Sequence, residues 1–276
     1  MVNAAADEFT AIERQLKERQ GLDLSRYKES YLRRRLLVRV RALKLPGLGA
    51  YARHLRRHPE EIGRLQRALS IKVTGLFRNR SCFAFLEEHV IPGIVERAAR
   101  RGRRVDAWSA GCSTGEETYS LASLFAVAIE GKNAVRVRIT GTDIDEAALT
   151  RCREARFPAA ALAGTAPPQA RRFFDPLPDG VAVPSRALRR MVRFEREDLM
   201  RPFARHDLDL ILCRNVLIYF SLDHQETILS RFAAALSEGG SLMLGRVERL
   251  FGPARDLFDV SSPRDRVYRR TGAACE

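Results

Sequence analysis

The chain has 276 residues and a net charge of +14, with 45% hydrophobic and 30% charged residues. This composition excludes a disordered chain, a collagen-like chain and a small disulfide-stabilised protein. The longest nearly apolar run, residues 121–129, is far shorter than the ~20 residues of a membrane-spanning helix, so we expect no direct membrane insertion. The N-terminus lacks the pattern of a secretory signal, which favours a cytoplasmic location. The five cysteines are widely spaced without a CxxC pair, which predicts reduced thiols and no metal site.

The positive charge is concentrated near the N-terminus. Residues 1–104 hold 24 Lys and Arg against 11 Asp and Glu, whereas the rest of the chain holds 24 against 23. This unequal distribution indicates either a docking surface for an acidic partner or a solvated basic face without a specific partner.

Residues 1–90 are expected to form a basic, all-helical N-terminal domain, because apolar residues recur there at every third or fourth position. The first clear helix ends at Pro46–Gly47. Two further helices are expected at residues 49–58 and from Pro59 onward, where a proline and two acidic residues favour a helix start. The apolar stripe of the first helix consists of Leu32, Leu36, Val40 and Leu43.

From residue 91 to residue 276, short apolar runs alternate with helical patterns, which favours a parallel sheet covered by helices on both faces. Segments 257–260 and 266–270 are too close for a helical crossover and predict an antiparallel pair at one edge. The Ala- and Pro-rich residues 158–168 are expected to be a surface connection. The expected parallel strands are residues 105–110, 135–140, 191–194, 208–213 and 241–244.

The strongest chemical pattern lies where the first of these strands meets its helix, at residues 108–117 with the sequence WSAGCSTGEE. Small residues let a ligand approach the backbone, and the first amides of the helix offer hydrogen-bond donors. The spacing of Gly111 and Gly115 is not GxGxxG, which disfavours a dinucleotide. Asp143 follows the second strand, where nucleoside-binding sheets hold ribose hydroxyls. A tight turn followed by a helix N-cap is the alternative interpretation.

Polar side chains also follow the third and fourth expected strands. Asp198 can accept a hydrogen bond from an adenine amino group, and Arg214, Asn215 and Tyr219 would reach the same rim of the sheet. Each residue alone is typical of a solvated turn. Together, a loop for a methionine-like tail, an acid for ribose and a polar group for adenine favour S-adenosylmethionine (SAM), whose sulfonium needs no phosphate-binding loop.

These motifs resemble those of the CheR family, the chemotaxis receptor glutamate methyltransferases, and the resemblance covers residues from about 9 to 268. The family implies an α/β fold of the class I methyltransferase (Rossmann-like) type, with a seven-stranded sheet in residues 91–276, a small all-helical domain in residues 1–90, and a small β-subdomain inserted at about residues 175–195. The matching segments are VTGLFR (73–78), WSAGCSTGEETYS (108–120), TDID (142–145), LCRNVLIYF (212–220), and Gly239–Gly240 with Glu248.

By this resemblance the cofactor is SAM and the product is S-adenosylhomocysteine. The chain departs from the family pattern at Lys72, Leu76, Thr118 and Arg246–Val247. Its insert is also short compared with relatives that clamp a C-terminal tether peptide of the receptor, so binding of a tether is not expected. The cofactor-binding positions that the family implies are Lys72, Thr74, Arg78, Glu117, Asp143, Asp198, Leu199, Arg214 and Asn215.

The reaction that the resemblance implies moves a methyl group from SAM to a glutamate carboxylate in the cytoplasmic helical domain of a methyl-accepting chemoreceptor. A glutamate with a pKa of about 4.3 is ionised at neutral pH, so no general base is needed. We expect Arg78 to orient the carboxylate or the cofactor, because a guanidinium matches carboxylate geometry, and Tyr219 to line the methyl site. The expected substrate-docking residues are Arg35, Arg39 and Arg41 on the basic first domain.

Two other functions fit parts of the pattern. A nucleic-acid methyltransferase would bind phosphates through the N-terminal arginines. Residues 214–216 (RNV), however, differ from the Asp/Asn-Pro-Pro-aromatic motif of enzymes that methylate amino groups of nucleic acids, so nucleic acid is not the expected partner. A cofactor-sensing interaction module would tolerate the departures at Lys72 and Arg246, but the chain also keeps Asp143 and Arg78.

Overall fold

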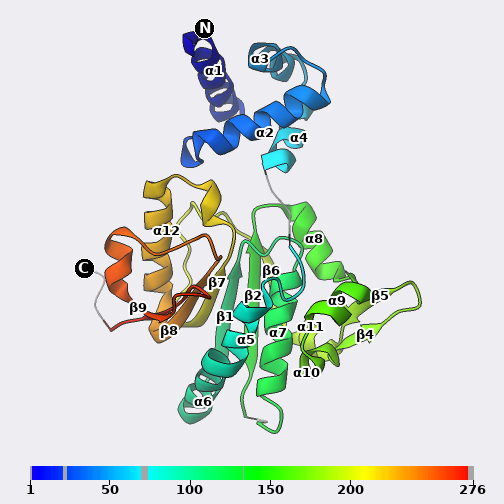
Figure 1. Cartoon of the computed structure of the whole chain (residues 1–276), viewed down its shortest axis with the longest axis vertical. Helices are drawn as coiled ribbons and strands as arrows, with labels where there is room; N and C mark the ends of the chain where they lie inside the picture. Colours follow the sequence, from blue (N-terminus) through cyan, green and yellow to red (C-terminus); the bar gives the residue numbers. More distant parts are fainter. Residues whose placement is uncertain (1, 21–23, 70–73, 133, 273–276) are drawn as a thin grey trace. The chain divides into compact units, whose positions relative to one another are not determined.

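Two compact units make up the computed structural model, which describes residues 2–20, 24–69, 74–132 and 134–272 (Figure 1). The first unit consists of Met1–Ile71 with Tyr219–His224, and the second of Lys72–Ile218 with Gln225–Glu276. None of the helices within the described ranges combines the length and the apolar character that a bilayer crossing requires.

The division between the units falls nearer the N-terminus than residue 90, the boundary expected from the helical pattern. The reason is packing. The helices that follow residue 79 bury Phe83, Leu86 and Ile94 in the hydrophobic core of the second unit. Helical periodicity in a sequence shows that a segment is a helix, but it does not show which core receives the apolar face.

The first unit is all-helical, as expected. Its helices are α1 (Val2–Gln20), α2 (Glu29–Ala42), α3 (Leu48–Arg57) and α4 (Glu60–Leu69), with one 3₁₀ turn, η1 (Leu24–Arg26). The stripe predicted on α2 is confirmed, because Leu32, Leu36 and Val40 are buried and Leu43 packs against the same core. Other buried members of this core are Phe9, Ile12, Leu16, Tyr51, Leu55, Ile62 and Leu65.

A buried ion pair joins α2 to α4. Nε and one Nη of Arg39 donate to the two carboxylate oxygens of Glu61, at 2.7 and 3.0 Å, and the Tyr51 hydroxyl donates to the same carboxylate at 3.1 Å. The side chain of Glu61 is 0% exposed. Burial by itself raises the pKa of Glu61, but the hydrogen bonds and charge of Arg39 outweigh it, so the pKa lies below its ordinary value.

The segment Tyr219–His224 belongs to the first unit although it follows a strand of the second in sequence. The backbone N–H of Lys28 donates to the Tyr219 carbonyl at 2.9 Å, and the Ser221 N–H donates to the Arg26 carbonyl at 3.0 Å. The ring of Tyr219 also packs against Tyr31, with 4.7 Å between the centroids.

The second unit is built on a seven-stranded sheet of order β6-β2-β1-β7-β8-β10-β9, which confirms the predicted fold. The first five strands in this order are parallel, and β10 runs antiparallel to both β8 and β9. The strands are β1 (Val105–Ala110), β2 (Val137–Asp143), β6 (Val192–Arg196), β7 (Leu208–Cys213), β8 (Leu236–Leu244), β9 (Phe258–Ser262) and β10 (Val267–Arg270).

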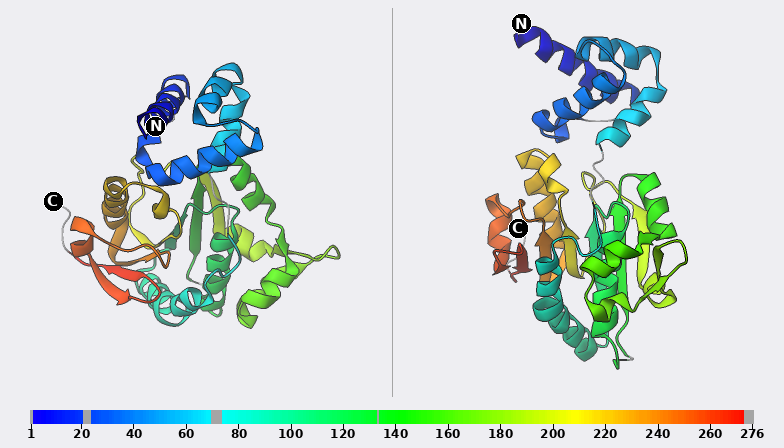
Figure 2. Two further views of the ribbon diagram at one scale, coloured as in Figure 1. Left: turned by 45° about the horizontal axis from the view of Figure 1, so that its top comes forward. Right: turned by 45° about the vertical axis from the view of Figure 1, so that its right-hand side comes forward.

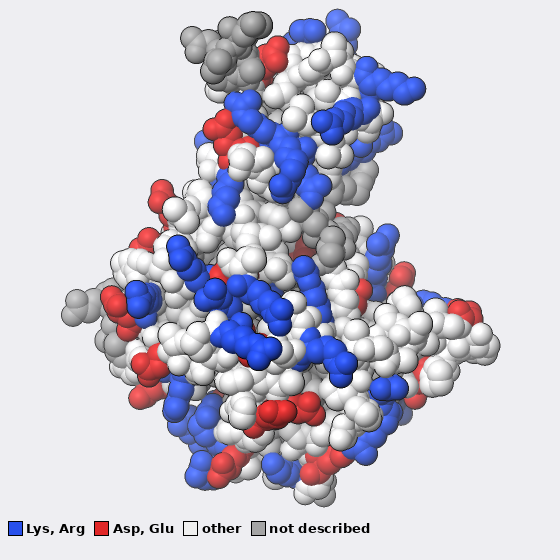
Figure 3. Space-filling model, in the orientation of Figure 1, with Lys and Arg blue, Asp and Glu red and all other residues white. Residues whose placement is uncertain are grey.

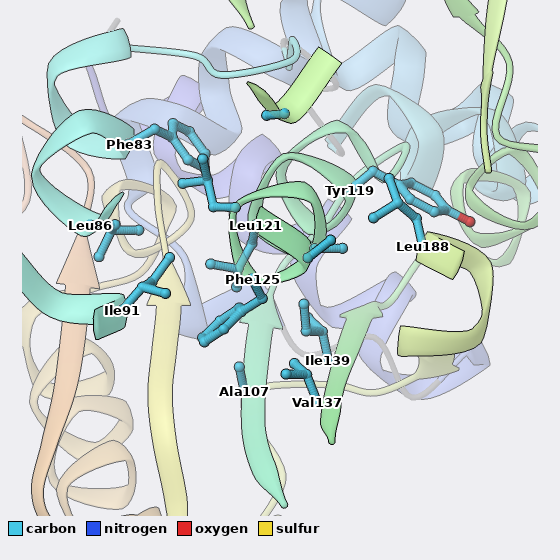
Figure 4. Packing of buried hydrophobic residues seen from close by; sticks show 14 of the residues in the cluster. Phe83, Leu86, Ile91, Ala107, Tyr119, Leu121, Phe125, Val137, Ile139 and Leu188 are labelled. Atoms are coloured by element: carbon cyan, nitrogen blue, oxygen red, sulfur yellow. The ribbon is translucent and has the colours of Figure 1, made fainter. Parts of the chain in front are cut away.

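Helices cover both faces of this sheet (Figures 1 and 2). Successive side chains of a strand point to opposite faces of the sheet, so neighbouring residues of β1 contact helices on opposite faces. Ala107 points into a core with Leu121 and Phe125 of α7 (Figure 4). Trp108 packs on the other face against Phe232 of α12, with 5.3 Å between the ring centroids. The covering helices are α5 (Arg80–Phe85), a π-helical turn (Leu86–Val90), α6 (Ile91–Arg101), α7 (Glu116–Ala128), α8 (Glu146–Glu154) and α12 (Leu222–Ala235).

A small three-stranded antiparallel sheet of order β3-β5-β4 is inserted between β2 and β6. Its strands are β3 (Phe157–Pro158), β4 (Phe174–Pro176) and β5 (Val181–Pro184). The insert therefore starts earlier than residue 175, and residues 192–195 belong instead to edge strand β6 of the large sheet. Helices α9 (Ala159–Thr165), α10 (Pro168–Arg171) and α11 (Arg186–Met191) accompany it, and the 3₁₀ turns η3 (Leu217–Tyr219) and η4 (Gly252–Leu257) complete the chain.

The prediction that residues 158–168 form only a surface connection is wrong. This segment contains the end of β3 and the whole of α9, and Leu162 and Ala166 are buried. Alanine is the strongest helix former, and a few apolar contacts suffice to hold one short helix against the core.

We expect Glu61→Gln to lower the stability of the helical unit by about 3 kcal/mol at neutral pH, because it leaves the partly buried Arg39 without its anion. The wild-type pair contributes fully above the ordinary pKa of 4.5 and is lost as the pH falls through the lower folded pKa of Glu61. Urea denaturation at several pH values measures both effects. The control is Glu60→Gln, whose side chain is exposed. Equal losses in the two variants would contradict the structural role of Glu61.

Candidate functional site

The loop between β1 and α7 has a backbone that only a few residue types can adopt. Gly111, Ser113 and Gly115 all have positive φ values, of 75°, 52° and 94°. A Cβ atom added to Gly111 would lie 2.4 Å from a methyl carbon of Val216, and one added to Gly115 would lie 3.2 Å from the sulfur of Cys152. The two glycines are therefore required by backbone conformation and by close packing.

Asp143, at the carboxyl end of β2, organises this loop. One of its carboxylate oxygens accepts the Ser113 N–H at 2.9 Å, and the other accepts the Asp145 N–H at 3.0 Å. The side chain is half-buried. These two hydrogen bonds tie the carboxyl end of β2 to the loop and to the start of α8.

Two buried cysteines, Cys112 within the loop and Cys152 in α8, support the backbone of the same loop. The thiol of Cys152 donates to the Ser113 carbonyl at 3.1 Å. The hydrogen bond to Cys152, together with burial, raises the pKa of Cys112 well above its ordinary value. Cys82, Cys112, Cys152 and Cys213 are all free thiols, in agreement with the sequence prediction. Neutral, buried thiols of this kind pack like small apolar residues.

Arg214 connects three segments of the rim. Its guanidinium lies 3.2 Å from a carboxylate oxygen of Glu117 and donates to the Arg78 carbonyl at 2.7 Å and to Oδ1 of Asn79 at 3.0 Å. The other Glu117 oxygen accepts from the Ser109 hydroxyl at 2.8 Å. Arg214 is 6% exposed. The structure thus brings together the predicted site residues Glu117, Arg214 and, through its backbone, Arg78.

Glu248 fixes the loop that follows β7. Its carboxylate, 4% exposed, accepts backbone N–H groups of Asn215 at 2.8 Å, Val216 at 2.9 Å, Ile218 at 3.3 Å and Gly245 at 2.6 Å. Burial raises the pKa of Glu248 despite these four hydrogen bonds. In the sequence, Glu248 stands out only as part of a motif. The available signal is an acid three residues after Gly245, which directly follows the buried strand β8.

The remaining predicted cofactor positions lie at or near the same edge of the sheet. Asp198 follows β6 and is half-buried, and one of its oxygens accepts the Met200 N–H at 2.9 Å. Leu199 beside it is buried, and Thr74 is half-buried. Lys72 lies outside the described residues.

The residues predicted for catalysis and docking in the first unit have different surroundings. Tyr219 packs against Tyr31 within that unit, and its role at the methyl site stays a prediction. Arg39 is held in the ion pair with Glu61, so its guanidinium stabilises the helical unit and is not available to dock a substrate. Arg35 is half-buried with its guanidinium 5.7 Å from the Tyr31 ring centroid, so Arg41 is the exposed member of the predicted docking set.

Two buried polar groups in this region are not paired. Within the described ranges, the Ser113 hydroxyl, in the loop between β1 and α7, and the Arg214 Nε are buried polar atoms without a hydrogen-bond partner. A carboxylate or hydroxyl group that reached them would accept a hydrogen bond from each. The described part of the chain contains no group of three or more His, Cys, Asp or Glu residues arranged to hold a metal ion.

Two family models match adjacent parts of the chain. The model described as "CheR methyltransferase, SAM binding domain" matches residues 72–266, and the model described as "CheR methyltransferase, all-alpha domain" matches residues 7–70. The boundary between the matches coincides with the division between the two compact units.

Several curated chemotaxis protein methyltransferases match this chain over most of their length. A chemotaxis protein methyltransferase of Listeria innocua is 31% identical over 254 residues, which cover 92% of this chain and 94% of the relative. One of Vibrio parahaemolyticus is 31% identical over 266 residues and covers 94% of each. An uncharacterized 104.1 kDa protein of Rhodobacter capsulatus is 36% identical over 253 residues, which form only 26% of its length.

We expect Glu248→Gln to destabilise the second unit by about 2 kcal/mol, because the amide presents an N–H donor to backbone groups that are themselves donors. Thermal unfolding measures this loss. Glu238→Gln, at an exposed position on β8, is the control and should change stability by less than about 0.5 kcal/mol. A Glu248→Gln variant as stable as the control would show that the four amides do not need this carboxylate.

Proposed function

The chain belongs to the CheR family of SAM-dependent methyltransferases, and we propose that it methylates glutamate side chains in the cytoplasmic helical domain of a chemoreceptor. The products would be a glutamate methyl ester and S-adenosylhomocysteine. The observation that carries the proposal is that three charged residues lie next to the carboxyl ends of neighbouring parallel strands, where open α/β sheets bind their ligands: Asp143 ends β2, Arg214 follows β7, and its ion-pair partner Glu117 is in the first turn of α7.

SAM supplies an activated methyl group on a sulfonium. The residues that would hold it are those around the open loop. Asp143, at the carboxyl end of β2, would accept hydrogen bonds from the ribose hydroxyls, and the partnerless Nε of Arg214 and hydroxyl of Ser113 suit the polar tail. Asp198 and Leu199, after β6, would meet the base. Thr74, Asn215 and Lys72 are further cofactor positions by family membership.

The acceptor needs no deprotonation. A solvent-exposed glutamate has a pKa of about 4.3 and is a carboxylate nucleophile at neutral pH. The protein therefore has to hold the acceptor oxygen in line with the methyl group, and positioning of this kind can lower the reaction barrier by ~7 to 11 kcal/mol. We assign the positioning of the carboxylate to Arg78, whose planar guanidinium offers two parallel donors.

The backbone around Arg78 is fixed in a way that suits this role. Phe77 and Asn79 on either side have positive φ values of 50° and 63°, and the Phe77 N–H donates to the Ser120 hydroxyl at 2.9 Å. Such backbone conformations cost roughly 1 to 3 kcal/mol each and persist only where surrounding contacts hold them. Here the buried ring of Phe77 and the bond from Arg214 to the Arg78 carbonyl supply those contacts.

Charge favours an acidic receptor as the partner. Residues 1–71 hold 16 Lys and Arg against 8 Asp and Glu. Basic side chains are spread over the surface of the helical unit in Figure 3. We therefore propose that Arg41, with its exposed neighbours, steers acidic receptor helices toward the enzyme in the cytoplasm, a long-range effect that salt would weaken.

We do not include a receptor tether peptide in the proposal. A peptide that adds to a sheet needs an edge strand with free N–H and C=O groups. Strand β4, at one edge of the small sheet, has only three residues and ends in Pro176, which has no N–H.

The test of the proposed function uses SAM labelled on the methyl group and receptor-bearing membranes, followed by mild base. A glutamate methyl ester releases volatile labelled methanol, whereas methylated nucleic acid or a methylated amine does not. A non-catalytic SAM-binding module would incorporate no label. Labelled methanol from the receptor supports the proposal, and its absence with active protein overturns it.

We expect Asp143→Ala to weaken SAM binding at least tenfold while the protein stays folded. The variant loses a carboxylate that bonds the loop amide of Ser113 and the ribose, and each charged hydrogen bond is worth roughly 1.5 to 3 kcal/mol. Calorimetric titration with SAM measures the affinity. Asp175→Ala, at an exposed position in the small sheet, is the control. Unchanged affinity in Asp143→Ala would remove the ribose assignment.

Arg78→Lys should keep the charge, lose the two-point contact and lower kcat by about 100-fold, with little change in SAM affinity. Single-turnover methyl transfer and thermal unfolding are measured on the same preparation. If Arg78 only stabilises the fold, the variant will melt at a lower temperature and its folded fraction will turn over normally. That outcome would remove Arg78 from the reaction.

A further inference from the structure

A short turn after β8 carries an unusual set of exposed side chains. Val247 is 74% exposed, the largest fraction among the exposed large hydrophobic residues in the described part of the chain. Arg246 before it and Arg249 after it are exposed as well. An exposed valine flanked by two exposed arginines offers a binding partner both an apolar contact and cationic ones.

The turn is held rigidly from beneath. Glu248, between Val247 and Arg249, points inward and accepts the N–H groups of Gly245 and Asn215. Gly245 is required at the start of the turn, because an added Cβ would lie 2.5 Å from a Glu248 oxygen. The exposed side chains of the turn are thus presented on a backbone whose conformation is fixed before any partner arrives, which lowers the entropy cost of binding.

The position of the turn in the sheet separates it from the cofactor residues. Most of the candidate cofactor residues follow β1, β2, β6 and β7, whereas the turn follows β8, on the far side of β7 from β1. The bond from the Asn215 N–H to Glu248 joins the turn directly to the rim. Arg246 also donates to the hydroxyl of Ser81, three residues after Arg78, so the turn borders the segment to which we assign the positioning of the acceptor carboxylate.

The turn also lies in a basic part of the surface. Arg246 donates to the Ser81 hydroxyl at 2.9 Å, next to the exposed Arg80, and its carbonyl accepts from Arg266 at 3.2 Å. Figure 3 shows Lys and Arg side chains gathered near the centre of this face, over α5. A carboxylate acceptor, and acidic residues beside it, would be attracted to this surface.

From these observations we infer that the turn Arg246–Arg249 is a substrate-recognition element, and that Val247 contacts an apolar side chain next to the target glutamate while Arg246 and Arg249 contact its acidic neighbours. The occupant is an acidic, amphipathic segment of the protein substrate. This inference rests on the proposed function and deepens it by naming the chemistry of the sequence around the methylated residue.

The test compares Val247→Ser and Arg249→Gln with matched controls at exposed positions elsewhere in the same unit. The controls are Val260→Ser on β9, where the valine is 57% exposed, and Arg255→Gln on η4. The measured quantities are kcat and KM for the receptor, the salt dependence of KM, the SAM dissociation constant and the melting temperature. Val247→Ile is the conservative variant that should restore the contact.

We expect Val247→Ser to raise the receptor KM at least about fivefold, which corresponds to about 1 kcal/mol, with SAM affinity and melting temperature unchanged. Arg249→Gln should raise KM and flatten its dependence on salt. Val247→Ile should have a nearly normal KM, and both controls should stay within about twofold of wild type.

Two outcomes overturn the inference and can be told apart. If wild-type protein forms no base-labile receptor ester, the proposed function fails and the inference fails with it. If the wild-type protein is active and KM is unchanged in Val247→Ser and Arg249→Gln, or changes equally in Val260→Ser and Arg255→Gln, the recognition element fails and the proposed function stands.

Discussion

The guanidinium of Arg214 is a cation held almost entirely out of water, and the arrangement of the site depends on how its charge and hydrogen bonds are satisfied. Glu117 supplies the counter-charge, and the Arg78 carbonyl and the Asn79 side chain supply two acceptors. A buried charge without such partners would cost several kcal/mol. The ion pair therefore fixes the relative positions of the β7 end, the start of α7 and the segment that carries Arg78.

Glu248 fixes the part of the rim formed by the segments after β7 and β8, as Arg214 fixes the part described above. Its buried carboxylate gathers four backbone amides from the segment after β7 and the turn after β8. The two charged groups come from neighbouring strands, and Arg214 is directly followed by Asn215, whose amide is bound to Glu248. Arg214 thus holds Glu117 and the segment of Arg78, and Glu248 holds the turn that we assign to the acceptor.

The sequence predicts the parts of this fold that rest on local pattern. The bounds of β1 and β7 agree with the expected strands, because both are almost entirely buried and consist mainly of apolar residues. Strand β8 begins at Leu236, earlier than expected, because its first residues include a polar pair and two glycines that carry no strand signal. The assignment of α5 and α6 to the second unit was not predictable, since it depends on which distant core their apolar faces join.

The partners of charged residues also depend on packing that the sequence does not show. Arg39 flanks the apolar stripe in the helical pattern and is expected to dock the substrate, but its partner Glu61 lies 22 positions away, and only the packed structure brings the two together. Glu248 is visible as an acid after a strand, yet nothing in the sequence shows that four amides converge on it. The carboxyl ends of parallel strands meet at one edge whatever the details of packing, so the sequence does predict that Asp143, Asp198 and Arg214 lie along the same edge of the sheet.

We propose that the methylated atom is a carboxylate oxygen of a protein glutamate, and mass-spectrometric mapping of the receptor after reaction decides this point. We expect receptor peptides to gain the mass of one CH₂ group, fragmentation to place it on a glutamate side chain, and mild base to remove it. A methyl group on a lysine, arginine or histidine nitrogen that resists mild base would rule out glutamate methylation.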